Sequence, residues 1–476
     1  MSRRIALVAS VAAILAGCGG GAATGPLAPF SRVPPSSAQD SPIAHVVVIV
    51  QENRSFDNLF ATFPGADGTT TGLEKVRQGS KYVVKSIALQ QSALVMNTDI
   101  GHCRYSYLTA LDHGKMDAFN LEPKGVCPRG SSGGGPTIGT IAYRYVNPEK
   151  IAPYWDLAKQ YALGDRLFQT QGSGSFTAHQ DLIRGNTQIS VAGASLVDTP
   201  TGMPWGCDSS KTARTDLLTT ALQFEEDKGP RPCTTDFPSS GSAYTTLRDL
   251  LDAKGVSWKY YSPCFAGSPG CGDGCTQCAG ALLNAFDVIA PVRNGKEWGT
   301  NVSMPQTNIF DDISKGRLPA VSWVIPTDND SDHPGTTVDR GPQWVASVVN
   351  AIGESTYWKT SAIVIVWDDW GGLYDHVKPP FHDKKGGLGF RVPLIVVSPY
   401  VPKGTLSHTQ YEFGSILKYV EQNWGLGSLE TTDQRSTSIL DVFNYKQSPR
   451  AFKPIQSQLS PAFFRSEPSS TGGDPE

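Results

Sequence analysis

Two apolar runs in this chain end abruptly in side chains that can bind a cation. The first run, Val46–Val50, has no alternating polar residues and is followed by Glu52 and Asn53. Such a run is typical of a parallel strand covered on both faces, and ligands bind outside the carboxyl ends of these strands. Glu52 and Asn53 are therefore candidates for a binding site. The alternative is an ordinary strand-to-helix turn with Ser55 as the N-cap.

The second run, 361–369, reads S-A-I-V-I-V-W-D-D and ends in the adjacent carboxylates Asp368 and Asp369. Neighbouring aspartates repel each other, and burying both is unfavourable unless a cation or hydrogen-bond donors offset the charge. The flanking Trp367 and Trp370 argue against a solvated acidic turn. A bound metal ion is the simplest compensation, and the two glycines that follow allow close approach of another backbone segment.

A serine-containing turn lies between a predicted strand and a predicted helix. The strand is expected near 162–168 and the helix over 177–184, with G-S-G-S-F at 172–176 between them. This order places a serine at a helix N-terminus, where backbone N–H groups and the helix dipole favour an anion. The turn offers Ser173 and Ser175, and a plain N-cap is the alternative role for Ser175.

The elements that position these residues alternate along the chain. We predict strands near 43–51, 162–168, 256–261, 318–326, 361–367 and 392–398, and helices over 55–63, 148–161, 177–184, 247–253, 344–352 and 413–424. This order favours an α/β fold with a mostly parallel central sheet and helices on both faces. The Gly-, Pro- and Cys-rich region of about 190–300 is expected to hold insertions that shape a substrate pocket.

Together these motifs resemble the bacterial phosphoesterase family of phospholipases C and related acid phosphatases, within the alkaline-phosphatase-like superfamily. The resemblance covers about residues 43–445 and implies an alkaline-phosphatase-like fold. It rests on the following stretches, in this order: H-V-V-V-I-V-Q-E-N-R-S-F-D at 45–57, D-x-x-H at 99–102, H-G-K-M-D-A-F at 113–119, D-H-P at 332–334, W-D-D-W-G-G-L-Y-D-H-V-K-P-P at 367–380, G-L-G-F-R-V-P-L-I-V-V-S-P-Y at 387–400 and H-T-Q-Y-E-F-G-S-I-L-K at 408–418.

The resemblance implies one divalent metal ion and a serine nucleophile, Ser175. All of the implied ligands offer oxygen, which favours Ca²⁺ or Mg²⁺ over softer ions. The family's turn usually reads G-P-S/T-x-P-N, whereas residues 173–178 keep the serine but lack both prolines and the asparagine. Ser173 is therefore a competing nucleophile. The implied metal ligands are Glu52, Asn53, Ser175, Asp368 and Asp369.

Histidines supply the remaining roles. His102 and His333 match family positions that contact the phosphoryl group, where an imidazolium can stabilise negative charge or protonate a leaving oxygen. With His333, the residues Asp328, Asp330 and His408 loosely resemble the set that binds a second metal ion or phosphate in two-metal members of the superfamily. The weaker histidine candidates are His113, His179 and His376.

These expectations amount to a metal-dependent phosphoesterase, acting on either a phospholipid or a small phosphomonoester. The alternative is a non-catalytic surface lipoprotein that uses the same fold to bind a ligand or partner. The formal net charge of −3 provides no basic field for nucleic acid, so a nucleic-acid partner is not expected.

The N-terminal residues 1–18 are predicted to be a lipoprotein signal peptide. Arg3 and Arg4 precede the apolar run Ile5–Ala16, and L-A-G-C at 15–18 resembles a bacterial lipoprotein cleavage box. Acylation of Cys18 would anchor an exported protein in the bacterial cell envelope; a plain signal peptide is the alternative. Residues 19–41 read as a flexible tether, 42–452 as the phosphoesterase domain and 453–476 as a polar tail.

Eight further cysteines form an even set, which in an exported chain indicates disulfides. The nearest partners in sequence are Cys103 with Cys127 and Cys207 with Cys233. Two more bridges are favoured over a zinc site for the remaining four cysteines, which are Cys264, Cys271, Cys275 and Cys278.

Overall fold

The computed structural model describes residues 41–125, 127, 135–189, 195–201, 205–207, 209–219, 223–233, 244–265, 280–380 and 387–467. These residues belong to one compact unit, Pro35–Glu476. The predictions for the signal peptide, Cys18 and nearly all of the tether lie outside the described residues. Within the described ranges, no helix has both the length and the apolar character needed to cross a bilayer.

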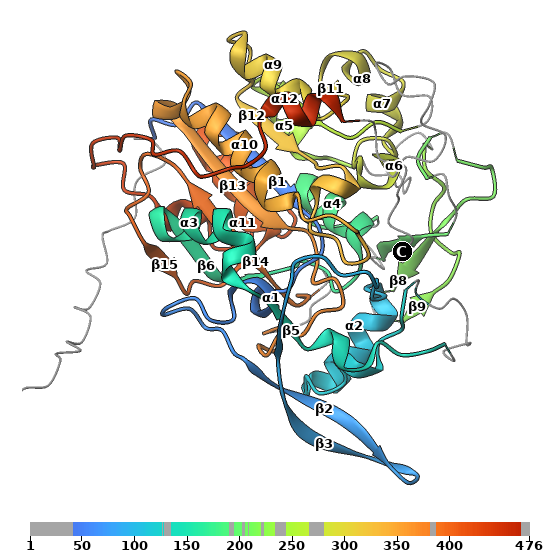
Figure 1. The fold of residues 1–476 in the computed structure, drawn as a ribbon. Helices are drawn as coiled ribbons and strands as arrows, with labels where there is room; N and C mark the ends of the chain where they lie inside the picture. Colours follow the sequence, from blue (N-terminus) through green and yellow to red (C-terminus); the bar gives the residue numbers. More distant parts are fainter. Residues whose placement is uncertain are drawn as a thin grey trace, which may run out of the picture. The chain divides into compact units, whose positions relative to one another are not determined.

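The described residues form a central sheet of nine strands, in the order β11-β10-β12-β1-β13-β14-β6-β15, with β16 beside β6. Every pairing is parallel except those of β14, which runs antiparallel to both β13 and β6. The sheet is therefore mostly parallel, as predicted (Figure 1). Its strands are β1 (His45–Gln51), β6 (Ala162–Phe168), β10 (Trp258–Tyr261), β11 (Val302–Ser303), β12 (Val321–Val324), β13 (Ser361–Trp367), β14 (Arg391–Val397), β15 (Thr405–Ser407) and β16 (Tyr411–Glu412).

The central strands are apolar along their whole length because both faces of the sheet are covered. Every residue of β13 and β14 is buried, and so is β1 after its first residue. In the register of β1 with β13, Gln51 lies opposite Trp367. The two strands thus end level with each other, and the residues that follow them emerge side by side.

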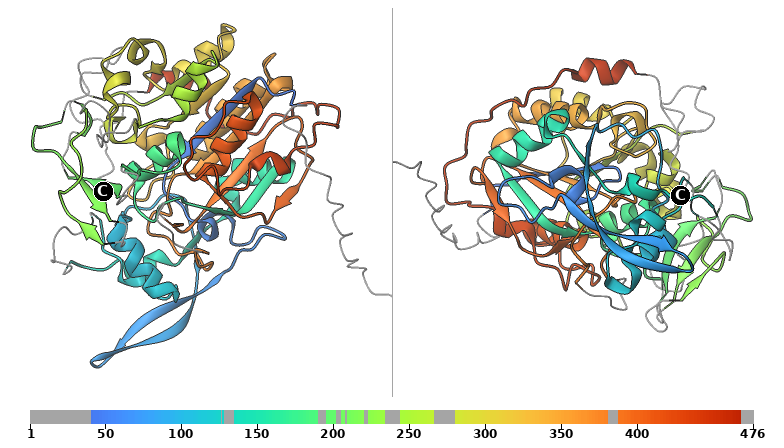
Figure 2. Two further views of the ribbon diagram at one scale, coloured as in Figure 1. Left: turned by 180° about the vertical axis from the view of Figure 1, so that it is seen from behind. Right: turned by 60° about the horizontal axis from the view of Figure 1, so that its bottom comes forward.

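Helices cover both faces of the sheet, as predicted. The helices α3 (Ala152–Gln160) and α10 (Gly341–Gly353) pack together on one face. On the opposite face, α4 (Ser175–Arg184) packs against α11 (Phe413–Trp424) (Figure 2). The other α-helices are α1 (Phe56–Phe60), α2 (Arg104–Leu111), α5 (Leu247–Ala253), α6 (Gly280–Leu283), α7 (Ala290–Arg293), α8 (Glu297–Thr300), α9 (Asn308–Ser314) and α12 (Pro461–Ser466).

Smaller sheets lie outside the central one. They are the hairpin of β2 (Thr71–Gln78) and β3 (Lys81–Ala88), the pair of β4 (Gln90–Ser92) and β5 (Arg144–Val146), and the sheet of β7 (Leu196–Pro200), β8 (Thr215–Leu218) and β9 (Phe224–Glu225). The predicted insertion region of about 190–300 contributes this last sheet, but it also supplies β10 to the central sheet. Part of the predicted polar tail is packed, because Phe464 of α12 contacts the ring of Trp344.

Disulfides join Cys103 to Cys127 and Cys207 to Cys233, which confirms both predicted pairs. Cys264 is disulfide-bonded as well. The predictions for Cys271, Cys275 and Cys278 lie outside the described residues.

Candidate active site

The ends of β1 and β13 deliver three carboxylates to one buried place. Glu52 follows β1, and Asp368 and Asp369 follow β13; none of the three is more than 1% exposed. Asn53 adopts a left-handed backbone conformation with φ of 59°, and its N–H donates to Asp368 Oδ1 at 3.2 Å. The predicted ligands from the two apolar runs therefore meet at the carboxyl edge of the sheet.

A glycine allows the two strand ends to come this close. A Cβ atom on Gly371 would lie 2.2 Å from the carbonyl oxygen of Asn53, which no other residue could tolerate without moving the backbone. The N–H of Gly371 donates to Asp369 Oδ1 at 2.7 Å and orients that carboxylate. The close approach expected for this glycine is confirmed.

Ser175 completes the group from the other side. It is the first residue of α4, whose N-cap is Gly174, so Ser175 does not serve as the N-cap. Its Oγ lies 3.2 Å from Asp369 Oδ2, 3.3 Å from Asn53 Oδ1 and 3.4 Å from Glu52 Oε2. The structure thus brings all five predicted metal ligands together.

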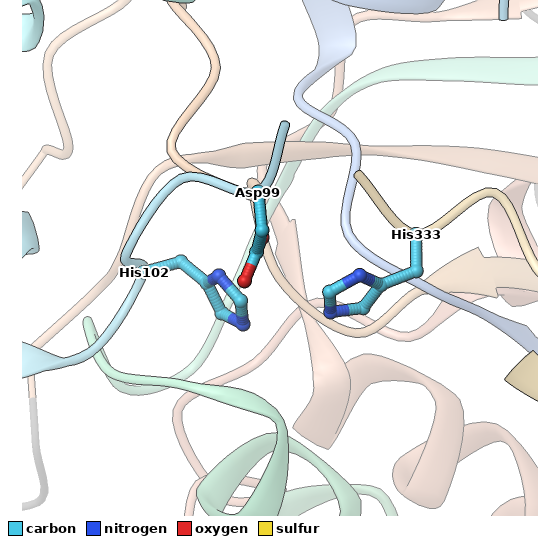
Figure 3. A group of neighbouring side chains, drawn as sticks. All are labelled: Asp99, His102 and His333. Atoms are coloured by element: carbon cyan, nitrogen blue, oxygen red, sulfur yellow. The ribbon is translucent and has the colours of Figure 1, made fainter. Parts of the chain in front are cut away.

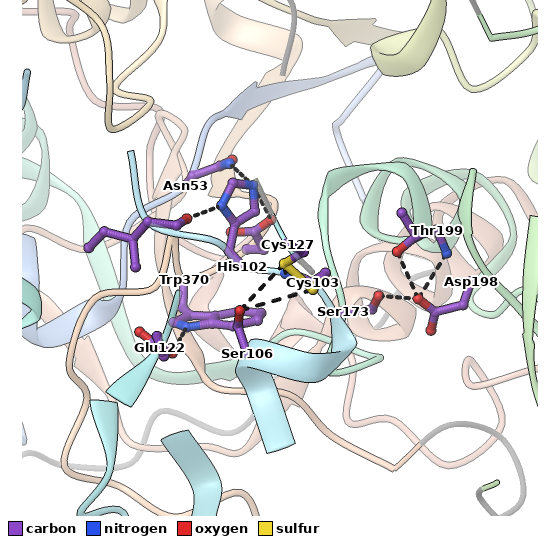
Figure 4. Close-up of a disulfide and its surroundings, with 12 residues drawn as sticks. Asn53, His102, Cys103, Ser106, Glu122, Cys127, Ser173, Asp198, Thr199 and Trp370 are labelled. Carbon is purple, nitrogen blue, oxygen red and sulfur yellow. Dashed lines mark hydrogen bonds and ion pairs between the residues drawn. A yellow bond between two sulfur atoms is a disulfide. The ribbon is translucent and has the colours of Figure 1, made fainter. Parts of the chain in front are cut away.

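Ser173, the competing serine of the same turn, is engaged elsewhere. Its Oγ donates to Asp198 Oδ1 at 2.5 Å, and Asp198 lies on β7, outside the central sheet (Figure 4). Asp198 also accepts hydrogen bonds from the backbone N–H of Thr199 at 2.9 Å and from Gln171 Nε2 at 3.0 Å. Ser173 therefore anchors the turn to the insertion, while Ser175 faces the carboxylates.

The atoms around the Asn53 amide decide whether a cation fits this donor set. Its oxygen lies 3.0 Å from Glu52 Oε2 and 2.7 Å from Asp368 Oδ1, so it faces oxygen atoms only. Rotation of the amide replaces these contacts by hydrogen bonds, so the amide itself is satisfied without an ion. The carboxylates of Glu52, Asp368 and Asp369 and the Ser175 hydroxyl offer oxygen ligands in either orientation. In the absence of an ion, burial and then the charge of Glu52 raise the pKa of Asp368 to about 7. The residues present fit a hard divalent cation.

His179 also belongs to this group, although it was one of the weaker histidine candidates in the sequence. Its Nε2 lies 3.1 Å from Glu52 Oε1 and 3.8 Å from Asp368 Oδ2, and these three residues are close enough to share an ion. The signal that could have identified it is its spacing. His179 follows Ser175 by four residues on a helix, and positions i and i+4 lie on the same helix face.

His102 and His333 flank the far side of the Asn53 amide. The Nε2 atoms of both rings lie 3.0 Å from one amide position of Asn53. The Nδ1 of His102 pairs with the carbonyl of Ile100 at 2.7 Å, and that of His333 pairs with the carbonyl of Pro334. Backbone contacts at Nδ1 therefore leave both Nε2 atoms turned toward the site.

Asp99 joins these two histidines. One side-chain ligand atom from each of the three lies within 4.8 Å of the others, and the side chains point toward a common centre (Figure 3). The D-x-x-H spacing of Asp99 and His102 was the available sequence signal for this residue. The group can accommodate a second cation, or it can contact an anion through the imidazoles.

Buried neighbours hold the histidines in place. Asp332, next to His333, accepts hydrogen bonds through Oδ2 from Tyr154 Oη at 2.8 Å and from Trp367 Nε1 at 2.9 Å. Burial raises the pKa of Asp332 to about 6. On the other side, the Cys103–Cys127 disulfide directly follows His102 in the chain (Figure 4).

The structure does not gather the predicted second-metal set. Asp330 accepts a hydrogen bond from Thr327 Oγ1 at 2.9 Å, and the exposed His408 pairs with Asp165 at 2.7 Å. The described residues contain three groups of acids and imidazoles close enough to share an ion, and none includes Asp328, Asp330 or His408.

The third of these groups consists of Asp57, Asp375 and His376. Arg391 Nε donates to Asp375 Oδ1 at 2.8 Å, and its Nη2 lies 3.3 Å from Asp57 Oδ1. The guanidinium group supplies the positive charge here, so this cluster is an internal ion-pair network.

The chain is similar in sequence to known phospholipases C. The chain is 26% identical over 424 residues to the non-hemolytic phospholipase C of Burkholderia pseudomallei, which covers 80% of this chain and 55% of that protein. It is 25% identical over 458 residues to phospholipase C B of Mycobacterium tuberculosis, covering 87% and 80% of the two chains. The chain thus spans about half the length of the first relative and most of the second.

Among solved structures, a protein of the alkaline phosphatase superfamily from Vibrio parahaemolyticus has 9% identity and a TM-score of 0.34, covering 82% of this chain and 68% of that one. The family assignment therefore rests on sequence. The model of the Phosphoesterase family matches residues 43–427, which confirms the resemblance seen in the motifs. The chain belongs to the Phosphoesterase family.

Proposed function

We propose that this protein is a metal-dependent phosphoesterase that hydrolyses phosphate esters through Ser175. The observation that carries the proposal is the position of Ser175 Oγ, 3.2–3.4 Å from three side chains of an oxygen-rich, buried cluster. Membership of the Phosphoesterase family and the phospholipase C relatives support the same reaction class.

One divalent ion, Ca²⁺ or Mg²⁺, fits the donor set best because the five ligands all offer oxygen. When bound, the ion would lower the pKa of the serine hydroxyl and neutralise charge on a phosphoryl oxygen. The residues that would hold it are Glu52, Asn53, Ser175, Asp368 and Asp369.

Each step of the proposed reaction uses particular side chains of the site. Ser175 Oγ bonds to phosphorus while the bond from phosphorus to the leaving oxygen breaks, and the serine proton passes to Asp369 Oδ2, the nearest carboxylate oxygen at 3.2 Å. A protonated Nε2 of His102 or His333 donates its proton to the leaving oxygen. The same imidazole, now neutral, takes a proton from the water that attacks the phosphoserine. As the bond from phosphorus to Oγ breaks, Asp369 returns its proton to the serine oxygen, so phosphate is released and Ser175 is restored.

The relatives named phospholipase C favour a phospholipid as the substrate. A small phosphomonoester would use the same residues, because all of the chemistry lies at the phosphoryl group. We further propose that the protein is exported and anchored in the cell envelope through acylated Cys18, since L-A-G-C at 15–18 follows an apolar leader.

One experiment tests the reaction and the substrate together. The purified chain is freed of metal with a chelator and assayed on p-nitrophenyl phosphate and on micellar phosphatidylcholine, before and after addition of Ca²⁺ or Mg²⁺. We expect no turnover in chelator and recovery with one of the two ions. Release of diacylglycerol identifies a phospholipase C. Failure of both substrates at saturating metal would contradict the proposal and favour a binding role.

The location is tested separately by Cys18→Ala. This variant should move from the detergent-dependent membrane fraction to the soluble fraction or to an uncleaved precursor. An unchanged distribution would refute the lipid anchor.

A further inference from the structure

The β2–β3 hairpin extends away from the central sheet in Figures 1 and 2. Its register pairs Lys75 with Val84 and Arg77 with Tyr82, and directly paired residues share a face of the ladder. Leu73, two residues before Lys75, lies on the same face. Leu73, Val84 and Tyr82 are 41%, 49% and 54% exposed, so one face of the hairpin presents three large apolar side chains beside the exposed Arg77. Lys75 lies on the same face but is half-buried and ion-paired.

The helix α2 carries the same kind of side chain beside the hairpin. Tyr105 and Leu108 are 45% and 47% exposed and lie three residues apart, which places them on one face of the helix. Lys75 of the hairpin pairs with Asp112, the C-cap of α2, at 2.6 Å. Of the six exposed large apolar side chains among the described residues, five belong to the hairpin or α2. We call these five side chains the apolar surface.

The charge of the hairpin is opposite to that of the chain. Residues 71–88 contain four cationic side chains and one acid, Glu74, whereas the whole chain has a formal net charge of −3. Arg77, Lys81 and Lys85 are exposed. Tyrosine and the long stems of lysine and arginine are suited to the boundary between lipid headgroups and acyl chains, and the cations attract anionic headgroups.

Both elements are attached to segments that carry the candidate active site. A Cβ atom on Gly72 would lie 2.9 Å from the ring of Tyr374, which belongs to the loop that follows Asp369. The hydroxyl of Tyr143 donates to the carbonyl of Leu73 at 2.6 Å and fixes the base of the hairpin. α2 begins directly after His102 and Cys103. A partner surface that binds the hairpin and α2 would therefore lie next to the candidate active site.

We propose that the hairpin and the apolar surface form a docking site for the surface of a bilayer that contains anionic phospholipids. Apolar side chains of this size exposed together mark interaction sites, and the exposed cations of the hairpin, Arg77, Lys81 and Lys85, favour an anionic lipid surface over an uncharged one. This docking is independent of acylation at Cys18. It is also independent of catalysis, because none of its residues belongs to the Ser175 cluster.

The test uses the full chain with Cys18→Ser, so that no acyl chain contributes to binding. Co-sedimentation with vesicles of phosphatidylglycerol and phosphatidylcholine in equal amounts should show binding that weakens as salt is raised, with much weaker binding to phosphatidylcholine alone. Tyr82→Ser combined with Val84→Ser should weaken binding to the mixed vesicles at least tenfold. Its melting temperature and its turnover of p-nitrophenyl phosphate should stay unchanged, because both side chains are exposed.

Two double variants with the same change in net charge distinguish the contribution of the hairpin cations from that of the overall charge of the protein. Arg77→Gln with Lys81→Gln should lower affinity for the mixed vesicles at least fivefold, whereas Lys254→Gln with Lys403→Gln, two exposed lysines outside the hairpin, should not. Equal losses in the two pairs, equal binding to both vesicle types, or no effect of the Tyr82 and Val84 changes would overturn the proposal.

Binding is also measured with Ser175→Ala, which is expected to bind vesicles like the parent chain. The vesicle-binding result can therefore be interpreted even if the proposed hydrolysis fails. If only a protein from the cell envelope, and no vesicle, binds the hairpin, the surface is a protein interface and the lipid proposal is wrong.

Discussion

Replacing Ser175 and Ser173 by alanine, one at a time, separates the chemistry of this turn from its architecture. Ser175→Ala removes the oxygen that lies 3.2 Å from Asp369 and 3.4 Å from Glu52. The histidines and carboxylates cannot replace the covalent step, so we expect kcat to fall by roughly four to six orders of magnitude. The change also removes hydrogen bonds to buried carboxylates, which costs about 2 kcal/mol of the free energy of unfolding, so kcat is compared per folded molecule.

Ser173→Ala should act on stability instead. The change removes the hydrogen bond to Asp198, whose carboxylate still accepts from Thr199 N–H at 2.9 Å and from Gln171 at 3.0 Å. Loss of one hydrogen bond to a buried carboxylate costs about 2 kcal/mol of the free energy of unfolding. We expect kcat to remain within about threefold of the parent value, since no atom near the phosphoryl group is removed.

Three measurements decide between the serines. Steady-state turnover of p-nitrophenyl phosphate gives kcat, urea unfolding gives the free energy, and an acid quench with labelled substrate traps phosphate on the enzyme for peptide mapping. Label on Ser173, or a Ser175→Ala enzyme within tenfold of the parent, would refute the assignment of the nucleophile. A large loss of stability in Ser175→Ala with wild-type turnover per folded molecule would refute it equally.

Three further predictions concern the surroundings of the serine. Asp369→Asn should lose both bound metal, measured by elemental analysis, and turnover while the protein stays folded; wild-type metal content would contradict the ligand assignment. His179→Gln should weaken metal affinity by about 10–100-fold in titration calorimetry, because the ring orients Glu52 at 3.1 Å, and an unchanged affinity would make His179 merely structural. Burial raises the pKa of Asp332 to about 6, so the native state binds more protons than the unfolded state between about pH 4 and 6 and stability from this group falls as pH rises. The free energy of unfolding of Asp332→Asn, measured in urea, should therefore rise by up to about 3 kcal/mol relative to that of the parent between pH 4 and pH 8. A difference between the two proteins that does not change with pH would contradict this.

The strands and helices that surround the site could be predicted because their signals are local. An apolar run without alternation indicates a strand covered on both faces, and β13 is buried at every residue. The predicted bounds of β6 and α11 match the structure, since each element is flanked by residues of different character. The family resemblance added Ser175, His102 and His333, which no local pattern assigns to one site.

Other features depend on contacts that are distant in sequence. The reversal of β14 follows from its pairing with β13 and β6, and the apolar sequence of the strand is the same in either direction. The role of Ser173 depends on Asp198 in the insertion, 25 residues away. The β2–β3 hairpin buries little surface, so its sequence lacks the continuous apolar run that indicates a strand of the core. His179 was ranked low because a lone histidine carries little information without its neighbours.

Two acidic clusters in this molecule differ in how their negative charge is balanced. Asp57 and Asp375 lie against the guanidinium group of Arg391, at 3.3 Å and 2.8 Å, so the fold itself supplies their positive charge. Asp368 is placed differently: burial and the charge of Glu52 both raise its pKa, and the opposing partners are a histidine and a serine hydroxyl. Burying carboxylates together in this way is unfavourable for folding unless the charge is balanced. A divalent ion would supply the balance and activate the serine at the same time, so the feature that weakens the fold without metal is the one that the proposed reaction requires.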